Sequence, residues 1–377
     1  MTHSNDAVHH GERQWVADLQ PGDDVRDRYL VWRKNLLMAK NGRPYVSMVL
    51  GDHTGKIETR IWDHADNLAT LFEAQDVIEI KGRVIKYQDH RQLNVIAVKR
   101  IPTEDVDITE LLPTSRHPIA EMMEELTGVI ASIHKPPLRR LLETIVALPD
   151  VKEGLLRAPA AKTIHHAWTG GLLEHTLSVC RLLDSIWTHY DAIFPGMMDR
   201  DILMAGGILH DLGKIWELGG ITFEYTDRGK LLGHMALVYE VIDHAIREQE
   251  DFPADIEMHL KHLVLSHHGQ LEYGSPKRPK TAEAWALHYA DILDGRMTWL
   301  NALTTELEPG EWSTYQRLYD RYFWKPPRHG DAIEPSSPNE FPDPSEAEAS
   351  DADQTDEPKP SPQLSLLEAT PKNTRQP

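Results

Sequence analysis

The sequence predicts a multidomain fold, in which an N-terminal all-β barrel precedes an all-α domain and a disordered acidic C-terminal tail. The chain has 377 residues, which at roughly 100–200 residues per domain indicates more than one domain. Its hydrophobic period changes from strand-like to helical near residue 118, and its composition turns rich in Pro, Asp and Glu beyond about residue 326. The expected boundaries are 1–20 for a flexible leader, 21–105 for the barrel, 106–325 for the helical domain and 326–377 for the tail.

Short runs rich in Val, Ile, Tyr and Trp, separated by turn residues, indicate strands in the first domain. The expected strands are Tyr29–Met38, Pro44–Leu50, Lys56–Trp62, Val77–Tyr87 and Gln92–Ile101, with a short helix over His64–Phe72. Five strands with a helix after the third is the order of an OB-fold barrel, an architecture that binds oligonucleotides and oligosaccharides.

From Pro118 onwards apolar residues recur at helical spacing and almost no strand signal remains, which predicts an all-α domain. The expected helices include residues 122–133, Leu138–Leu148, Gly171–Tyr190, Asp201–Leu212, Leu231–Glu250, Ile256–Ser266 and Ala282–Leu300. Residues 330–377 hold nine prolines and too little apolar surface to offset the entropy of ordering, so we expect this tail to be disordered.

Composition narrows the class of protein. Hydrophobic residues make up 40% of the chain, but no apolar run is long enough to suggest a membrane span. A single cysteine, Cys180, excludes an internal disulfide framework and a Cys-rich zinc site, and favours a reducing cytoplasm. The net charge of −19 excludes a uniformly basic surface, yet residues 21–105 carry 14 Lys/Arg against 13 Asp/Glu. The barrel is therefore the part that tolerates an anionic partner.

The strongest chemical signal is His210-Asp211, which follows the apolar run Ile202–Leu209. An imidazole beside a carboxylate suits a hard-to-borderline divalent cation. Lys214 comes four residues after His210, so we expect it on the same helical face, where it could neutralise a phosphate next to the metal.

Other histidines and aspartates lie in otherwise apolar helical stretches, namely His175, His234, His267-His268 and Asp291. Any one of them alone is more often a surface or helix-capping residue. Buried polar side chains are costly unless they are satisfied, so the ordered set predicts ligands on facing helices around one metal-binding cavity.

The pattern His175, then His210-Asp211, then Asp291 resembles the HD-domain metal-dependent phosphohydrolase superfamily. The additional His234 and His267 resemble the members of that superfamily that hold a second metal. Flanking motifs narrow the likeness: His165-His166 before Gly170-Gly171-Leu172-Leu173-Glu174-His175, and His267-His268-Gly269 before Gly274-Ser275-Pro276. Together with an N-terminal OB-fold, residues 25–325 resemble the YhaM-type 3′→5′ exoribonucleases, whereas the acidic tail has no counterpart in that resemblance.

The resemblance implies a divalent metal centre with two ions. His175, His210, Asp211 and Asp291 would hold the first ion, and Asp211 would bridge to a second ion held by His234 and His267. His268 would be either a ligand or a substrate contact. The ions would lower the pKa of a bound water and orient it in line with the phosphodiester, while Lys214 would stabilise charge on the phosphoryl oxygens. The mixed His/Asp set favours Mn or another transition metal and makes an oxygen-ligated Mg site a weaker alternative.

Three further residues of the helical domain have two interpretations each. His166 and Arg278 would contact substrate, but His166 could instead cap the next helix, and Arg278 could be a solvated residue of its Pro-rich loop. His288 lies one helical turn before Asp291, where it would support the ligands rather than join them.

The barrel carries the residue types that bind single strands by aromatic stacking and cationic contact with the backbone. The candidates for substrate binding are Trp32, Arg33, Arg60, Trp62, Lys86 and Tyr87. Strand alternation places Arg60 and Trp62 on one face of the sheet and Lys86 and Tyr87 on opposite faces. Any single aromatic here could be barrel core, whereas the set favours a single-stranded nucleic acid partner of modest affinity.

The tail contains one apolar cluster, Gln363-Leu364-Ser365-Leu366-Leu367. It resembles the short peptide with which many bacterial proteins bind the DNA sliding clamp, and such peptides commonly lie in disordered tails. Chance is the alternative for five residues. Clamp binding would move the function towards DNA replication or repair. A homo-oligomer is also compatible with the apolar helices.

Three functions fit these observations. The first is a metal-dependent 3′→5′ exonuclease acting on single-stranded RNA, and on DNA as a further candidate substrate. The second is a nucleotide or cyclic-dinucleotide phosphohydrolase with a regulatory OB domain. The third is a clamp-tethered single-strand-binding protein whose metal site is structural.

Overall fold

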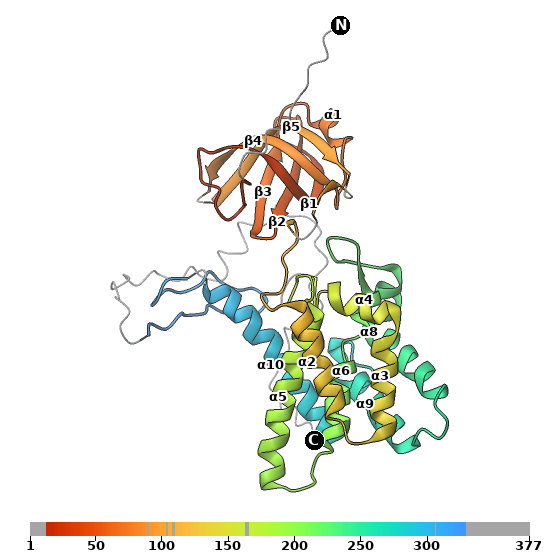
Figure 1. Ribbon diagram of the computed structural model, residues 1–377. Coiled ribbons are helices and arrows are strands. Elements are labelled where there is room, and N and C mark those ends of the chain that lie inside the picture. The colour runs from red at the N-terminus through yellow and green to blue at the C-terminus, as the bar shows by residue number, and fades with distance from the viewer. Residues whose placement is uncertain are drawn as a thin grey trace, which may run out of the picture.

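The computed structural model describes residues 13–328, apart from residues 89, 103–104, 108–109, 163–165 and 306. Two domains are visible, a β-barrel near the N-terminus and a larger helical domain (Figure 1). The predicted order of a barrel followed by a helical domain is confirmed. Within the described residues, no helix is long and apolar enough to cross a membrane.

The barrel is closed, with strand order β1-β2-β3-β5-β4. Its elements are β1 (Asp24–Met38), β2 (Pro44–Asp52), β3 (Gly55–Ile61), α1 (Ala65–Ala69), β4 (Val77–Tyr87) and β5 (His90–Ile101). All neighbours are antiparallel except β3 and β5. The helix after the third strand and the parallel β3–β5 closure confirm the predicted OB-fold.

Side-chain alternation divides each barrel strand into an inner and an outer row. On β2, Val46, Met48 and Leu50 are fully buried in the barrel core, so Tyr45 and Ser47 belong to the outer row. The first strand begins five residues earlier than predicted, because its charged start, Asp24–Arg28, pairs in register with β4 and hides the strand pattern.

The predicted leader is too long. Residues 13–20 pack on the barrel, where Val16 and Leu19 are buried in its core. The backbone N–H of Gln14 donates to the carboxylate of Asp27 over 2.6 Å. These two isolated apolar residues form no periodic pattern, which is why the sequence alone placed the boundary at residue 21. Residues 1–12 lie outside the described part of the chain.

The helical domain surrounds one continuous apolar core. Its helices are α2 (Ile119–Ala131), α3 (Pro136–Ala147), α4 (Pro149–Arg157), α5 (Gly171–Ile193), α6 (Arg200–Leu209), α7 (Lys214–Glu217), α8 (Asp227–Arg247), α9 (Ala254–Ser266) and α10 (Ala282–Thr305). The short helices α4 and α7 were not predicted, because four to nine residues show too little periodicity.

A small hairpin interrupts the helices of this domain. Strands β6 (Leu218–Gly219) and β7 (Glu224–Tyr225) pair in antiparallel fashion between α7 and α8. The all-α prediction missed this β6–β7 hairpin because two-residue strands carry no alternation. At its turn, Phe223 adopts a left-handed backbone conformation with φ of 59°, which is unusual for a residue with a side chain.

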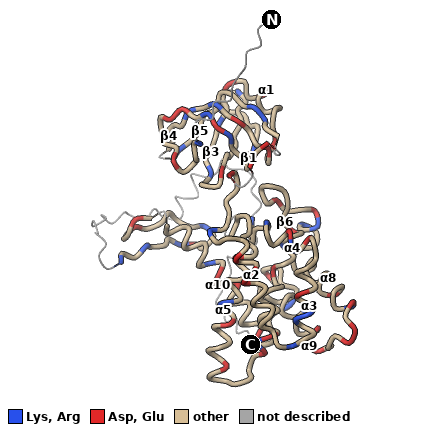
Figure 2. The backbone as a smooth tube through the Cα atoms, in the orientation of Figure 1, with Lys and Arg blue, Asp and Glu red and all other residues tan. Residues whose placement is uncertain are grey.

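The β6–β7 hairpin is where the two domains meet (Figure 2). The ring of Trp32 on β1 lies edge-on to that of Phe223, with centroids 6.4 Å apart. The backbone N–H of Ile221 donates to the side-chain oxygen of Gln75 over 3.3 Å. Leu30 and Leu111 belong to a separate small apolar cluster beside this contact.

After α10 the chain folds back on its own last helix. The ring of Trp299 contacts those of Tyr319 and Phe323, with centroids 4.2 and 5.1 Å apart. The described residues end at 328, so the tail and its peptide Gln363–Leu367 lie outside them. The disordered tail, the sliding-clamp contact and the homo-oligomer all stay predictions.

Candidate metal centre and nuclease site

The predicted metal ligands come from five separate elements and meet at one buried point. His175 lies on α5, His234 on α8 and Asp291 on α10. His210 and Asp211 follow the end of α6, and His267 and His268 follow the end of α9. All of these side chains are buried except that of Asp291, which is partly exposed.

The first group of donors contains His175, His210, Asp211 and Asp291, whose ligand atoms all lie within 4.8 Å of one another. The Nε2 atom of His175 lies 3.3 Å from Nε2 of His210 and 3.3 Å from Oδ2 of Asp211. It also lies 3.3 Å from Oδ1 of Asp291. Two ligands of one ion bonded at 2.0–2.2 Å lie about 3.0–3.5 Å apart, so these separations suit a shared cation.

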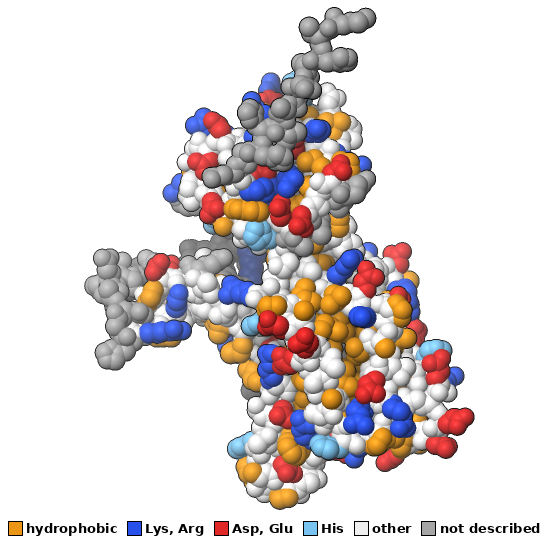
Figure 3. Space-filling view, viewed as in Figure 1, with side chains coloured by type: hydrophobic (Ala, Val, Ile, Leu, Met, Phe, Trp, Pro, Cys, Tyr) orange, Lys and Arg blue, Asp and Glu red, His pale blue; other side chains and the backbone are white. Residues whose placement is uncertain are grey.

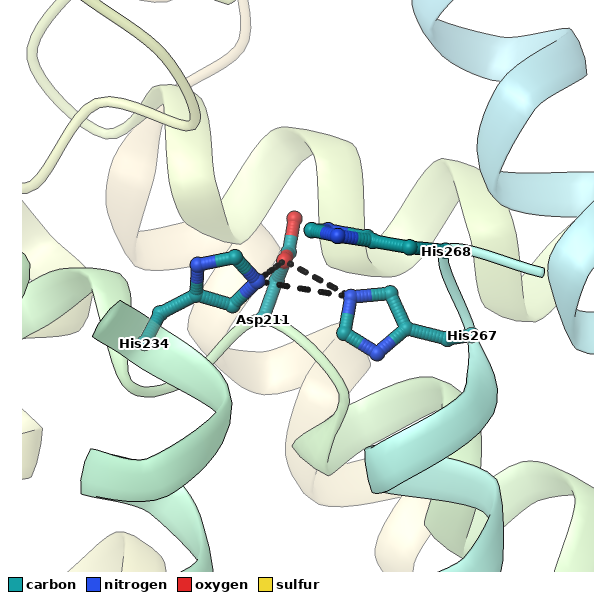
Figure 4. A group of neighbouring side chains, drawn as sticks. All are labelled: Asp211, His234, His267 and His268. Carbon is teal, nitrogen blue, oxygen red and sulfur yellow. Dashed lines mark hydrogen bonds and ion pairs between the residues drawn. The ribbon is translucent and has the colours of Figure 1, made fainter. Parts of the chain in front are cut away.

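The second group contains Asp211, His234, His267 and His268 (Figure 4). The Nε2 atoms of His234 and His267 lie 3.4 Å apart, and both point to Oδ1 of Asp211 over 3.5 and 3.6 Å. That oxygen is buried and accepts no hydrogen bond from the described residues. Because a buried carboxylate oxygen without a donor is unfavourable, it is a natural position for a cation.

Glycine permits the close approach that joins the two groups. A Cβ on Gly213 would lie 2.0 Å from the backbone oxygen of His234. Only glycine fits in this turn, so the chain after Asp211 can pack directly against the start of the His234 segment. Gly233, whose φ is 74°, kinks α8 immediately before His234.

Hydrogen bonds decide which ring nitrogen of each histidine faces the centre. Nδ1 of His210 lies 2.8 Å from the carbonyl oxygen of Gly207, and Nδ1 of His267 lies 2.7 Å from that of Val264. His268 makes the same type of contact, over 3.0 Å, with the carbonyl of Tyr273. Because a carbonyl only accepts, Nδ1 donates in each case and the Nε2 lone pair is left for a metal.

Two carboxylates outside the predicted set orient the remaining imidazoles. Asp294 accepts from Nδ1 of His175 over 2.7 Å, and Glu217 lies 3.2 Å from Nδ1 of His234. Sequence reasoning missed both as site residues. Asp294 follows Asp291 by three residues on α10, which is a usable helical signal, whereas Glu217 becomes recognisable only through its contact with His234.

Lys214 lies at the centre, although not as predicted. Helix α6 ends at Leu209, so Lys214 shares no helical face with His210 and instead begins α7. Its Nζ atom donates to Oδ2 of Asp211 over 2.6 Å. Burial raises the pKa of Asp211, but the charges of Lys214 and His210 outweigh it, and the pKa lies well below its usual range.

Burial lowers the pKa of both His267 and His268 below the ordinary histidine value, and the neighbouring imidazoles lower that of His268 further. Both rings are therefore neutral near pH 7, which is the form that binds metal. His268 is a member of the second donor group, and both its predicted roles, as a ligand and as a substrate contact, stay predictions.

The other predicted residues of this domain lie around the centre. His166 is buried, and its Nε2 atom lies 3.1 Å from Asp294. His288 donates from Nδ1 to the carbonyl of His267 over 2.7 Å, which supports that ligand as expected. Arg278 is exposed in its loop and lies 3.8 Å from Glu272. Substrate contact by His166 and Arg278 stays a prediction.

The barrel candidates fall into two sets. Trp62 is 48% exposed and stacks on Tyr45, with centroids 4.8 Å apart. Glu58 on β3 lies 3.2 Å from the guanidinium of Arg33 and 2.8 Å from that of Arg60. All three side chains lie on the outer face of the sheet. This aromatic and cationic surface, made of Arg33, Tyr45, Arg60 and Trp62, is called the barrel face below.

The second set of barrel candidates lies elsewhere. Trp32 lies in the domain contact rather than on the barrel face. Lys86 and Tyr87 end β4, and Tyr87 is 54% exposed. Charges of both signs are interspersed on the visible side of the barrel, as the near-balanced composition predicts (Figure 3).

Comparison with known proteins agrees with both domains. Residues 172–296 match the HD domain family, and residues 25–101 match the OB-fold nucleic acid binding domain family. The chain is 34% identical over 313 residues to the 3′-5′ exoribonuclease YhaM of Bacillus velezensis, covering 82% of this chain and 96% of that protein.

This chain belongs to the YhaM family.

Two further YhaM proteins described as 3′-5′ exoribonucleases match to the same extent. That of Shouchella clausii is 35% identical over 318 residues, covering 83% of this chain and 97% of that protein. The YhaM protein of Bacillus subtilis is 33% identical over 314 residues, covering 82% of this chain and 96% of that protein. All six predicted metal ligands lie inside the region that matches the HD domain, so their convergence is consistent with a metal-dependent YhaM enzyme.

Proposed function

We propose that this protein is a metal-dependent 3′→5′ exonuclease that hydrolyses single-stranded RNA, with single-stranded DNA as a second candidate substrate. The observation that carries the proposal is the position of Asp211. Its Oδ2 atom faces His175 and its Oδ1 atom faces His234 and His267, so one carboxylate joins two donor groups. Membership of the YhaM family supplies the polarity and the preference for RNA.

We infer that this centre would hold two divalent ions, with Asp211 offering one carboxylate oxygen to each of the two donor groups. The donor chemistry fits them, because neutral imidazole nitrogens and carboxylate oxygens converge and Oδ1 of Asp211 lacks a hydrogen-bond donor. The mixed donor set favours Mn²⁺ or another transition metal over Mg²⁺. When bound, such ions supply Lewis acidity that lowers the pKa of the attacking water and offsets charge on the phosphoryl oxygens.

The chain's own residues orient the substrate and balance its charge. Lys214 is partly buried next to Asp211, where its ammonium offsets charge on a phosphoryl oxygen that replaces the carboxylate as its partner. His268 belongs to the second donor group and is neutral near pH 7, so it binds either an ion or the scissile phosphate. Asp294 and Glu217 hold His175 and His234 in one tautomer.

The barrel face holds the strand. Tyr45 and Trp62 form a stacked, partly exposed pair that offers a platform for bases. Arg33 and Arg60 lie beside these two rings, and both contact the carboxylate of Glu58. A phosphate of the strand therefore has to displace only one carboxylate to reach two guanidinium groups. Such contacts bind any sequence and weaken as salt rises.

The test is a degradation assay on 5′-labelled single strands of matched RNA and DNA. Metal-stripped protein is assayed with Mn²⁺ or Mg²⁺, and the Asp211→Asn variant is assayed beside it. We expect a metal-dependent ladder that shortens from the 3′ end and disappears in the variant. Hydrolysis of mononucleotides with intact oligonucleotides would refute the exonuclease and favour the nucleotide phosphohydrolase. Equal processing by Asp211→Asn would refute a catalytic metal centre.

Two further proposals concern a protein partner and the cellular location. Binding of a sliding clamp through residues 363–367 is supported by the peptide pattern alone. Deletion of these residues should abolish co-elution with a purified bacterial clamp without changing nuclease activity. A cytoplasmic location is proposed from the single buried cysteine, and fractionation of cells that express the protein would test it.

A further inference from the structure

Two lysines from different domains lie near the turn of the β6–β7 hairpin. Lys56, at the start of β3 in the barrel, places its Nζ atom 3.4 Å from the centre of the Trp32 ring. Trp32 in turn contacts Phe223 of the hairpin. Lys162 of the helical domain lies 2.8 Å from Glu224, the next residue of the same hairpin.

Lys56 and Lys162 together have fewer carboxylate partners than positive charges. Glu224 accompanies Lys162, but no carboxylate of the described residues pairs with Lys56. The Lys56 side chain is exposed, but partial desolvation of its amine and the charge of Lys162 lower its pKa to about 8. An anion with several acceptor oxygens would satisfy both amines.

The same hairpin leads to the metal centre. Tyr225 follows Glu224, is 41% exposed and pairs with Leu218, the residue after Glu217. Helix α7, which leads into this hairpin, carries both Lys214 and Glu217, and Glu217 lies 3.2 Å from Nδ1 of His234. Lys214 itself contacts Asp211. Cationic and aromatic groups therefore continue from the barrel to the ligands.

We propose that Lys56 and Lys162 form an interdomain phosphate site, which holds one phosphodiester of a single strand as the strand passes from the barrel over the β6–β7 hairpin to the metal centre. The inference rests on the proposed exonuclease function. The ligand is a backbone phosphate, because two amines recognise oxygen atoms rather than a particular base. Tyr225 then stacks on a base nearer the scissile bond.

The test compares a long and a short substrate with the full-length protein. Lys56→Ala, Lys162→Ala and the double variant are assayed on an RNA of about 20 nucleotides and on a dinucleotide that ends at the metal centre. We expect each single variant to raise KM for the long RNA by about tenfold with little change in kcat, because a charged hydrogen bond is lost. The dinucleotide should be cleaved at the wild-type rate, which also shows that the variants are folded.

Salt dependence gives a second readout that structural damage would not mimic. Binding of the long RNA is measured by fluorescence anisotropy in the presence of a chelator, so that no cleavage occurs. The slope of log affinity against log salt should fall by about 0.7 for each lost phosphate contact. Lys162→Arg should retain the wild-type slope, and Lys81→Ala, which changes an exposed lysine on β4, is the matched control.

Three results would overturn the assignment or its basis. An unchanged KM and salt slope in the double variant would refute the phosphate site while the nuclease function stands. Equal losses on the dinucleotide would show that the lysines serve the fold or the metal centre. If the wild-type protein degrades no oligonucleotide, the proposed function itself is wrong, and the site has no strand to hold.

Discussion

Replacing Asp294 with asparagine tests whether a residue outside the ligand set controls metal binding. Asp294 is 6% exposed and accepts hydrogen bonds from His175 over 2.7 Å, from His166 over 3.1 Å and from the hydroxyl of Ser178. Burial raises its pKa, but the bonds from His166 and His175 lower it far more, so the carboxylate stays charged.

The expected cost follows from these three contacts. A hydrogen bond to a charged group contributes about 1.5–3 kcal/mol and a neutral one about 0.5–1.5 kcal/mol, so loss of the charge alone costs roughly 1–1.5 kcal/mol at His175. An asparagine whose amide nitrogen faces the imidazoles also donates to Nδ1 of His175, so this ring must carry its proton on Nε2, where it can no longer bind a metal. We therefore expect metal affinity to fall by about 10–100-fold.

Isothermal titration of metal-stripped protein with Mn²⁺ measures this loss directly. Ser178→Ala is the control, because it removes one donor but keeps the carboxylate and both imidazole contacts. We expect it to change the Mn²⁺ dissociation constant by less than about threefold. Wild-type affinity in Asp294→Asn, with an unchanged melting temperature, would refute the view that Asp294 positions His175.

Three further predictions concern the barrel, a glycine and a buried carboxylate. Trp62→Ala should weaken long-RNA binding by about 1–3 kcal/mol, as anisotropy measures, and leave dinucleotide cleavage unchanged. Gly269→Ala should lower the melting temperature more than Gly274→Ala. The two glycines have similar backbone angles, with φ of +79° at Gly269 and +78° at Gly274. Only at Gly269 would the new Cβ clash with another side chain, because it would lie 2.1 Å from the ring of His288. Equal losses would contradict this. Burial raises the pKa of Glu283, but the hydrogen bonds it accepts bring it to about 2. Its contribution, at most about 3 kcal/mol, is thus present above the unfolded pKa of about 4.5 and lost as pH falls towards 2. Calorimetry of Glu283→Gln should show a weaker acid dependence of stability in that window.

Local patterns in the sequence were sufficient for the fold class, and they singled out the candidate ligands for which the structure could be examined. The barrel strands alternate and the helical domain repeats apolar residues with helical spacing, so both periods can be recognised without contacts. The ligands His175, His210, Asp211, His234, His267 and Asp291 were selected by their chemistry and by resemblance to HD domains. The structure brings all six together.

Only the tertiary structure decided how these predicted ligands are divided between two donor groups and which side chains orient their rings. The bond between His175 and Asp294 spans 119 residues, and the contact between His234 and Glu217 spans 17 across a kink and a hairpin. Local periodicity carries no information about such pairs. The split of Asp211 between two donor groups has the same origin, because it depends on which helix ends pack around the carboxylate.

The docking of the barrel is the clearest case of this division. Trp32 and Lys56 belong to the residue types that bind nucleic acid, but their place at the turn of the β6–β7 hairpin follows from the packing of one domain on the other. The sequence determined which side chains the protein has for metal and phosphate, because chemistry is a property of single residues. Their convergence was decided by long-range packing, because distance between residues far apart in the chain exists only in the folded state.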